Sequence, residues 1–113
     1  MAIATKNRTV AKQLTTSYQD VYTAPPSFKA TVDSILITNS SNAPATVTME
    51  WWNKTLNEYT YLLGETVIHA NGVVQLTDTM AIDQGDIVRA LASANSAITV
   101  TIRATESYTT STL

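Results

Sequence analysis

Apolar and polar residues alternate with a period of two along much of this chain, and short polar turns separate the alternating runs. The run Ala45–Trp52 alternates throughout, and the run Ala97–Thr105 places Ile98, Val100 and Ile102 on one face. Alternation of this kind predicts β-strands with one buried face. After a first strand around Val21, further strands are expected over Phe28–Asn39, Glu58–Leu63, Thr66–His69, Val73–Thr77 and Asp86–Ala92.

The segments between these strands carry turn chemistry, and no helical pattern separates them. Asn39–Pro44 is rich in turn-forming residues, and the alternation slips by one position near Asp33, which predicts a β-bulge. Strands at spacings of about 8 to 12 residues without intervening helices are typical of antiparallel sheets. We therefore predict an all-β fold, an antiparallel β-sandwich or small jelly roll of about eight strands, over residues 17–106. A polar C-terminal tail is expected over residues 107–113.

The composition supports this interpretation and adds an expectation about the surface. The chain has 113 residues, which is enough for one domain. Threonine occupies 20 positions and only 14% of residues are charged, so the exterior is unusually poor in charge. Such a surface suggests that partners cover part of it. The chain has no Cys, so no disulfide framework is expected, and neither a signal peptide nor a membrane span is expected.

The N-terminal segment differs in charge from the rest of the chain. Residues 1–16 carry three basic and no acidic residues, a charge of +3, whereas the remainder has four basic and nine acidic residues, a charge of −5. The segment lacks a sustained period, so we predict an extended arm, with a frayed terminus as the alternative. Its charges would orient docking and its apolar residues would supply affinity. The expected interface residues of this arm are Ile3, Lys6, Arg8, Val10, Lys12 and Leu14.

The aromatic hairpin is the most distinctive local feature of the sequence. Trp51 and Trp52 are followed by Tyr59 and Tyr61 on the returning strand. Adjacent strand residues point to opposite faces, so the phase of the strand assigns Trp51 to the core and Trp52 to the outside. An outward Trp can anchor a protein interface, stack on a sugar ring or have no function. We predict an interface formed by Trp52, Tyr59 and Tyr61.

Residues able to carry catalysis or to bind metal are scarce. His69 is the only His and no nucleophile motif accompanies it, so we expect no catalytic residues and no enzyme activity. Asp83 and Asp86 flank Gly85 and could offer oxygens to Ca²⁺, but a turn before a strand uses the same residues, and we favour the turn. No metal and no cofactor are therefore expected. The net charge of −2 argues against nucleic acid as a partner.

Several short motifs recur in a known class of proteins. The stretch Leu14–Pro25, with the sequence LTTSYQDVYTAP, precedes a long strand that ends in Asn39 and a turn of small residues. Further along, Ala70-Asn71-Gly72 and Gln84-Gly85-Asp86-Ile87 introduce later strands, and Ala92-Ser93-Ala94 follows. In these motifs the chain resembles small virion proteins of tailed bacteriophages, over most of the stretch from Leu14 to Ile102.

The resemblance implies a non-enzymatic structural subunit, made in the host cytoplasm and built into the phage virion in several copies. Such proteins look like capsid decoration (cement) proteins, which bind and stabilise the major capsid lattice, or like tail, neck or fibre accessory subunits. The implied partners are other copies of the chain, as a homotrimer at three-fold lattice positions, and the major capsid protein or other virion proteins. A carbohydrate-binding module with a Trp platform is the remaining alternative. No membrane partner is implied.

Overall fold

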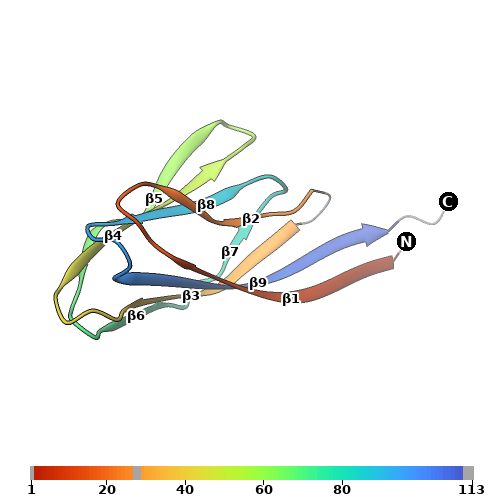
Figure 1. The fold of residues 1–113 in the computed structure, drawn as a ribbon. Coiled ribbons are helices and arrows are strands. Elements are labelled where there is room, and N and C mark those ends of the chain that lie inside the picture. The colour runs from red at the N-terminus through yellow and green to blue at the C-terminus, as the bar shows by residue number, and fades with distance from the viewer. Residues whose placement is uncertain (1, 27–28, 111–113) are drawn as a thin grey trace.

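The computed structural model describes residues 2–26 and 29–110, which form two antiparallel β-sheets packed face to face (Figure 1). One sheet has the strand order β1-β9-β3-β6, with β7 pairing with another part of β3, and the other has the order β2-β8-β4-β5. Within the described residues the strands are β1 (Ala2–Gln13), β2 (Gln19–Thr23), β3 (Lys29–Asn39), β4 (Ala45–Asn53), β5 (Glu58–Ile68), β6 (Val73–Leu76), β7 (Met80–Ile82), β8 (Ile87–Ala92) and β9 (Ile98–Thr110). The predicted antiparallel β-sandwich is confirmed.

The core lies between the two sheets and is built from the alternating apolar residues. On β9, Ile98, Val100 and Ile102 are each 0% exposed, and they share one core cluster with Val47 and Met49 of β4, also 0% exposed. Burying an aliphatic side chain of this size stabilises a fold by about 1.5–3 kcal/mol. The alternation that predicts these two strands therefore also identifies the residues that hold the sheets together.

The long strand β3 contains the predicted bulge. Its pairing with β9 shifts register between Val32 and Ser34, so that the inward positions change from Val32 to Ile35. The extra residue, Asp33, uses its carboxylate Oδ2 to accept a hydrogen bond from Thr105 Oγ1 at 2.7 Å. The bulge thus divides β3 into one part that pairs with β7 and another that pairs with β6.

A buried asparagine closes the turn that follows β3. Asn39 is 1% exposed, and its Nδ2 donates to the carbonyl oxygens of Ala43 at 2.8 Å and Ile68 at 3.1 Å. Its Oδ1 accepts the backbone N–H of Ser41 at 2.9 Å. The amide therefore replaces the backbone partners that the turn lacks, which explains why a polar side chain is stable at this core position.

The extended arm predicted over residues 1–16 does not stand apart from the sheets, because residues 2–13 form the edge strand β1. This strand pairs with β9 from Ala2 opposite Thr110 to Gln13 opposite Thr99. Residues 5–9 are exposed on both faces, which is why the sequence of β1 shows no period of two. The predicted polar tail is also shorter than expected, since β9 continues to Thr110. In Figure 1 β1 and β9 run side by side to the end of the molecule where both termini lie.

Two other strand assignments need correction. The sequence separates Glu58–Leu63 from Thr66–His69 at Gly64, but β5 continues through Gly64 to Ile68. Register shifts between β4 and β5, on either side of Met49, accommodate the interruption. The short strand β7, of 3 residues, was not predicted, because alternation over so few positions gives no signal.

Candidate assembly surface

The predicted aromatic residues lie on the outer face of the four-stranded sheet. Directly paired residues of antiparallel strands project to the same face. Trp52 pairs with Tyr59 of β5, and Glu50 pairs with Tyr61 of β5 and with Arg89 of β8. Three strands therefore contribute to one surface, to which Tyr18 is added before β2. We call this surface the aromatic face, and it consists of Tyr18, Glu50, Trp52, Tyr59, Tyr61 and Arg89.

Arg89 is the centre of the aromatic face. Its guanidinium carbon lies 4.2 Å from the ring centroid of Tyr18 and 3.8 Å from that of Tyr59. Its Nη2 is 2.6 Å from Oε1 of Glu50, and its Nε donates to the same oxygen at 2.8 Å. The side chains of Arg89 and Glu50 are only 25% and 10% exposed, so the pair is sheltered from solvent. The pair cancels its own charge and holds both tyrosine rings in place.

The exposed part of the aromatic face is formed by Tyr59 and Tyr61, next to Trp52, whose ring is held by contacts within the hairpin. Tyr59 is 50% exposed and Tyr61 is 65% exposed. The rings of Trp52 and Tyr59 are tilted by 36° with centroids 6.4 Å apart, and Trp52 Nε1 donates to Oδ1 of Asn57 at 3.2 Å. These contacts reduce the freedom of the rings before any partner binds. A partner can therefore bury aromatic surface here at a low cost in side-chain entropy.

Trp51 lies on the opposite face from Trp52, as predicted. Its ring packs against the core, although it is only half-buried. Its Nε1 donates to Oδ2 of Asp86 at 3.2 Å. The alternation thus assigns the two faces correctly, and the polar edge of Trp51 explains why this ring stays at the margin of the core.

Burial and charge both act on the Tyr18 hydroxyl. Partial burial, together with the nearby carboxylate of Glu50, raises the pKa of Tyr18 above its usual value, and Arg89 opposes this shift. The hydroxyl of Tyr18 is thus directed at Glu50 within the aromatic face. The face as a whole offers ring surface, hydroxyl groups and one internally paired charge.

The N-terminal residues that were predicted to form an interface differ in burial and in the contacts that they make. Leu14 is 0% exposed and belongs to the core, so its assignment to an interface is wrong. Lys6 and Arg8 lie beside Glu106, with Lys6 Nζ 3.6 Å from Oε1 and Arg8 Nη1 3.6 Å from Oε2. Val10 is half-buried against the core. Lys12 is exposed, and the side chain of Ile3 lies outside the part of the chain whose side chains are described.

The buried group that these cations contact, Glu106, was not predicted from the sequence. Glu106 is 0% exposed, and Tyr22 donates its hydroxyl hydrogen to Oε2 over 2.5 Å. Oε1 has no hydrogen-bond partner among the described residues. Burial and the hydrogen bond to Glu106 raise the pKa of Tyr22 well above its usual value, while Arg8 lowers it less. Glu106 extends the inward alternation of β9 beyond Ala104, and this phase was the signal that could have located it.

Asp86 organises a turn, which is the interpretation that the sequence favoured over a Ca²⁺ site. It is 1% exposed, and its Oδ1 accepts the backbone N–H of Lys54 at 3.0 Å. Its Oδ2 accepts Trp51 Nε1 at 3.2 Å and the backbone N–H of Asp83 at 3.1 Å. Gly85 has a φ of 81°, which a residue with a side chain rarely adopts. The carboxylate therefore joins the β4–β5 turn to the β7–β8 turn.

Residues 2–26 and 29–110, which the structure describes, include the single His of the chain. His69 is exposed and follows β5 directly. In this part of the chain no three side chains of the His, Cys, Asp or Glu type are grouped so that they could hold a metal ion. Nor do these residues contain a helix with the length and hydropathy needed to span a membrane.

Comparison with known proteins shows likeness in fold. No protein-family model and no curated protein sequence matches the chain. A chain of the Bacillus endospore appendages, described as disulfide-linked pili, is 16% identical with a TM-score of 0.57, over 96% of this chain and 89% of that one. A chain of the Helicobacter pylori bacteriophage KHP30 capsid is 7% identical with a TM-score of 0.54, over 93% and 90%. A chain of the virus-like particle of extra small virus, from the prawn Macrobrachium rosenbergii, is 8% identical with a TM-score of 0.57, over 98% and 82%. The chain thus shares its β-sandwich fold with capsid and pilus proteins.

Proposed function

We propose that this chain is a non-enzymatic structural subunit of a phage virion, and specifically a capsid decoration (cement) protein that stabilises the major capsid lattice. The observation that carries the proposal is the aromatic face. Tyr, Trp and Arg are the residues most enriched at the energetic centres of protein interfaces. Here they surround a sheltered ion pair on an exposed sheet, an arrangement that contributes little to the core and offers a ready contact to another protein.

The fold and the composition support the same proposal. Capsid and pilus proteins use this sandwich, although this chain has no Cys and so cannot use the disulfide linkage described for the pili. With 14% charged residues, its exterior is suited to contact with other protein surfaces. Decoration as a homotrimer at three-fold lattice positions is the arrangement we propose. A tail, neck or fibre accessory subunit would use the same aromatic face against a different partner.

The test measures binding to shells assembled from the major capsid protein encoded nearest to this chain's gene. A variant with Tyr59→Ser and Tyr61→Ser removes both exposed rings, and we expect its binding to weaken by about thirtyfold or more. Val73→Ser is the matched control, because Val73 is 61% exposed on the other sheet. Equal binding of both variants would refute the role of the aromatic face. A wild-type chain that leaves these shells bare would refute decoration, and tail assemblies would be tested next.

A carbohydrate-binding module is favoured by one specific observation, the exposed rings of Tyr59 and Tyr61. Planar rings on a flat sheet can stack on sugars. A glycan array would separate the two functions. Glycan binding by a monomer, lost in the double-serine variant and accompanied by no binding to shells, would replace the structural proposal.

A further inference from the structure

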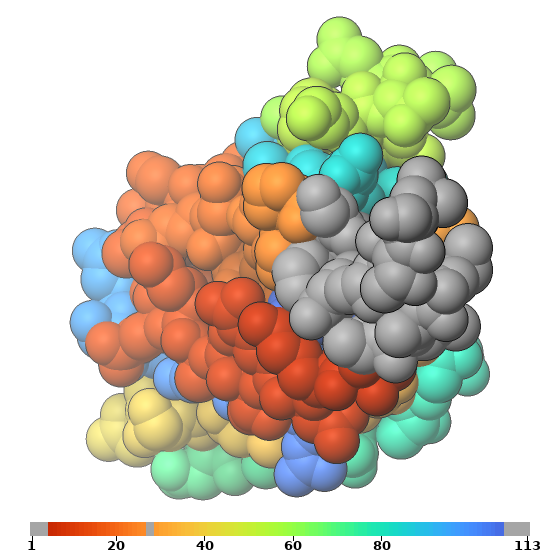
Figure 2. All heavy atoms as spheres, turned by 90° about the vertical axis from the view of Figure 1, so that its right-hand side faces the viewer, coloured from red at the N-terminus to blue at the C-terminus, as the bar shows by residue number. Residues whose placement is uncertain are grey.

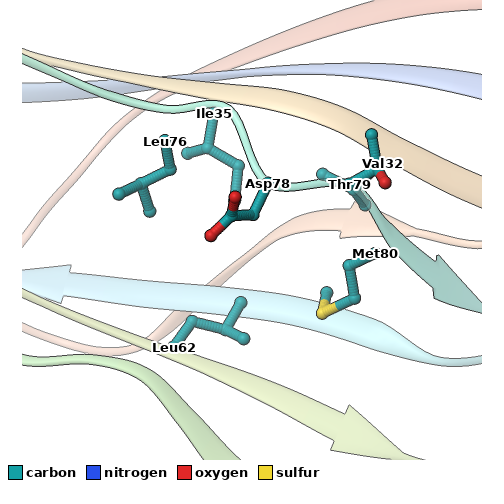
Figure 3. A pocket seen from close by; sticks show the side chains of 7 residues that line it. All are labelled: Val32, Ile35, Leu62, Leu76, Asp78, Thr79 and Met80. Carbon is teal, nitrogen blue, oxygen red and sulfur yellow. The ribbon is translucent and has the colours of Figure 1, made fainter.

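An apolar groove lies between the edges of the two sheets (Figure 3). It separates β5, at the edge of one sheet, from β6 and β7, at the edge of the other. Its volume is about 350 Å³, and its apolar lining consists of Val32, Ile35, Leu62, Leu76 and Met80. Figure 3 shows the carboxylate of Asp78 pointing into this groove from the β6–β7 linker. In the part of the chain described by the structure, Asp78 makes no ion pair.

The tip of the β4–β5 hairpin carries an exposed apolar side chain that could fill an apolar groove. The hairpin stands out from the body of the molecule (Figures 1 and 2), and Leu56 at its turn is 63% exposed. The backbone of the turn is held in place, because Leu56 N donates to Oδ1 of Asn53 at 3.1 Å and Lys54 N donates to Oδ1 of Asp86 at 3.0 Å. The tip therefore presents the apolar side chain of Leu56 on a preorganised turn. The side chain of Lys54, at the base of this turn, lies over Gly85 of the β7–β8 turn.

The tip cannot reach the groove of its own chain. Leu62, which lines the groove, is six residues along the chain from Leu56, and most of this separation is strand β5. At about 3.3 Å for each strand residue, this separation is roughly 20 Å. Because β5 is paired with β4 along this length, the hairpin cannot fold back on itself. Only a second molecule can bring the two surfaces together.

We propose that the hairpin tip of one copy inserts Leu56 into the groove of a second copy, with Lys54 of the first facing Asp78 of the second. The groove is large enough for a leucine side chain. Lys54, the one cation of the hairpin turn, would leave its position over Gly85 to meet Asp78, the one carboxylate among the lining residues of the groove. Tip and groove are different surfaces, so the contact is head-to-tail and each copy can make it twice. Repetition then builds a ring or a chain of subunits. This inference rests on the proposed role as a multicopy subunit and adds how the copies meet.

The absence of Cys from the chain allows a direct test by disulfide trapping. A Leu56→Cys variant is mixed under mild oxidation with a Thr79→Cys variant, which carries its thiol on an exposed residue of the groove. Trapping requires Cα atoms within about 7 Å, so we expect the mixture to yield about tenfold more covalent dimer than the control. In the control, Val73→Cys replaces the groove variant, because Val73 is also exposed but lies outside the groove. Met80→Cys provides a second position within it.

Sedimentation of charge variants provides an independent readout. Lys54→Glu and Asp78→Lys should each weaken self-association, and a chain that carries both changes should recover it, because the reversed charges meet again across the contact. Self-association without the trapped dimer and without this recovery would overturn the head-to-tail contact but leave the proposed function standing. Trapping of Leu56→Cys with itself would also overturn it in favour of a symmetric contact. A monomer at about 100 µM would overturn the head-to-tail contact, whereas the proposed decoration role fails only if the chain leaves the shells bare.

Discussion

The buried pair of Tyr22 and Glu106 allows a quantitative prediction about stability. Tyr22→Phe removes only the hydroxyl, which donates to Glu106 Oε2 over 2.5 Å. The carboxylate is 0% exposed, and its other oxygen already lacks a hydrogen-bond partner among the described residues. Lys6 and Arg8 cannot replace the lost hydrogen bond, because their nitrogens are 3.6 Å away and their side chains are 58% and 49% exposed.

The size of the effect follows from the charge of the acceptor. A hydrogen bond to a charged group contributes about 1.5–3 kcal/mol, so we expect Tyr22→Phe to lower the free energy of unfolding by about 2 kcal/mol. A domain of this size has a total stability of roughly 5–15 kcal/mol, and the change therefore lowers Tm by roughly 5–15 °C. Urea unfolding followed by Trp fluorescence measures the difference. Tyr61→Phe is the matched control, since the Tyr61 side chain is 65% exposed and its loss of a hydroxyl should change little.

The same pair predicts how stability depends on pH. The pKa of Tyr22 is raised in the folded protein above its usual value of 10.0, so the folded state keeps a proton that the unfolded state releases. Its contribution is complete below pH 10 and is lost as the pH rises toward the folded-state pKa, by about 1.4 kcal/mol for each pH unit. Tyr22→Phe should lack this alkaline loss. A variant within about 0.5 kcal/mol of the wild type, or one with the same alkaline slope, would refute the reasoning.

Three further predictions concern the aromatic hairpin, the edge strand and the Asp86 turn. Trp51→Ala should lower stability by about 3 kcal/mol in urea unfolding, whereas Trp52→Ala should leave unfolding nearly unchanged and weaken binding to shells; equal losses of stability would contradict the assignment of faces. Deletion of residues 2–13 removes the cations beside buried Glu106 and should lower stability by about 3–5 kcal/mol in thermal melting, and an unchanged melting curve would show that the segment is a dispensable arm. Asp86→Ala leaves three partly buried N–H donors without their acceptor and should cost about 3 kcal/mol, with Asp83→Ala, at an exposed position, as the control.

Alternation predicted the strands that have one buried and one hydrated face, and it failed for β1, in which residues 5–9 are all exposed. Ala45–Trp52 and Ala97–Thr105 were recognised because core and solvent impose opposite chemistry on neighbouring residues. The strand β1 was missed because its side chains over residues 5–9 are all exposed, and its stability comes from backbone pairing with β9. Backbone hydrogen bonds are the same for every sequence, so an edge strand of this kind leaves little trace in the residue pattern.

The aromatic face was predicted only as far as one hairpin extends. Trp52, Tyr59 and Tyr61 are close in sequence, so their common face follows from the turn between them. Arg89 and Tyr18 come from distant strands, and their positions follow only from the order β2-β8-β4-β5. The local sequence pattern could therefore predict the exposed rings of the aromatic face, but it could not predict Arg89, which holds these rings in place.

The distribution of charge in the folded chain argues against the expectation that N-terminal cations orient docking to a neighbour. Two of the three cations in the N-terminal segment, Lys6 and Arg8, lie against Glu106 inside their own protomer. Their charge is used to hold β1 against β9, so it contributes little to the recruitment of a neighbour. The two surfaces that we propose for assembly are the aromatic face, with its internally paired charges, and the apolar groove with its hairpin tip. At both surfaces the attraction would come mainly from the burial of apolar and aromatic side chains. This attraction is short-ranged and weakly screened by salt. Assembly should therefore depend on the fit of preformed surfaces more than on long-range electrostatic attraction.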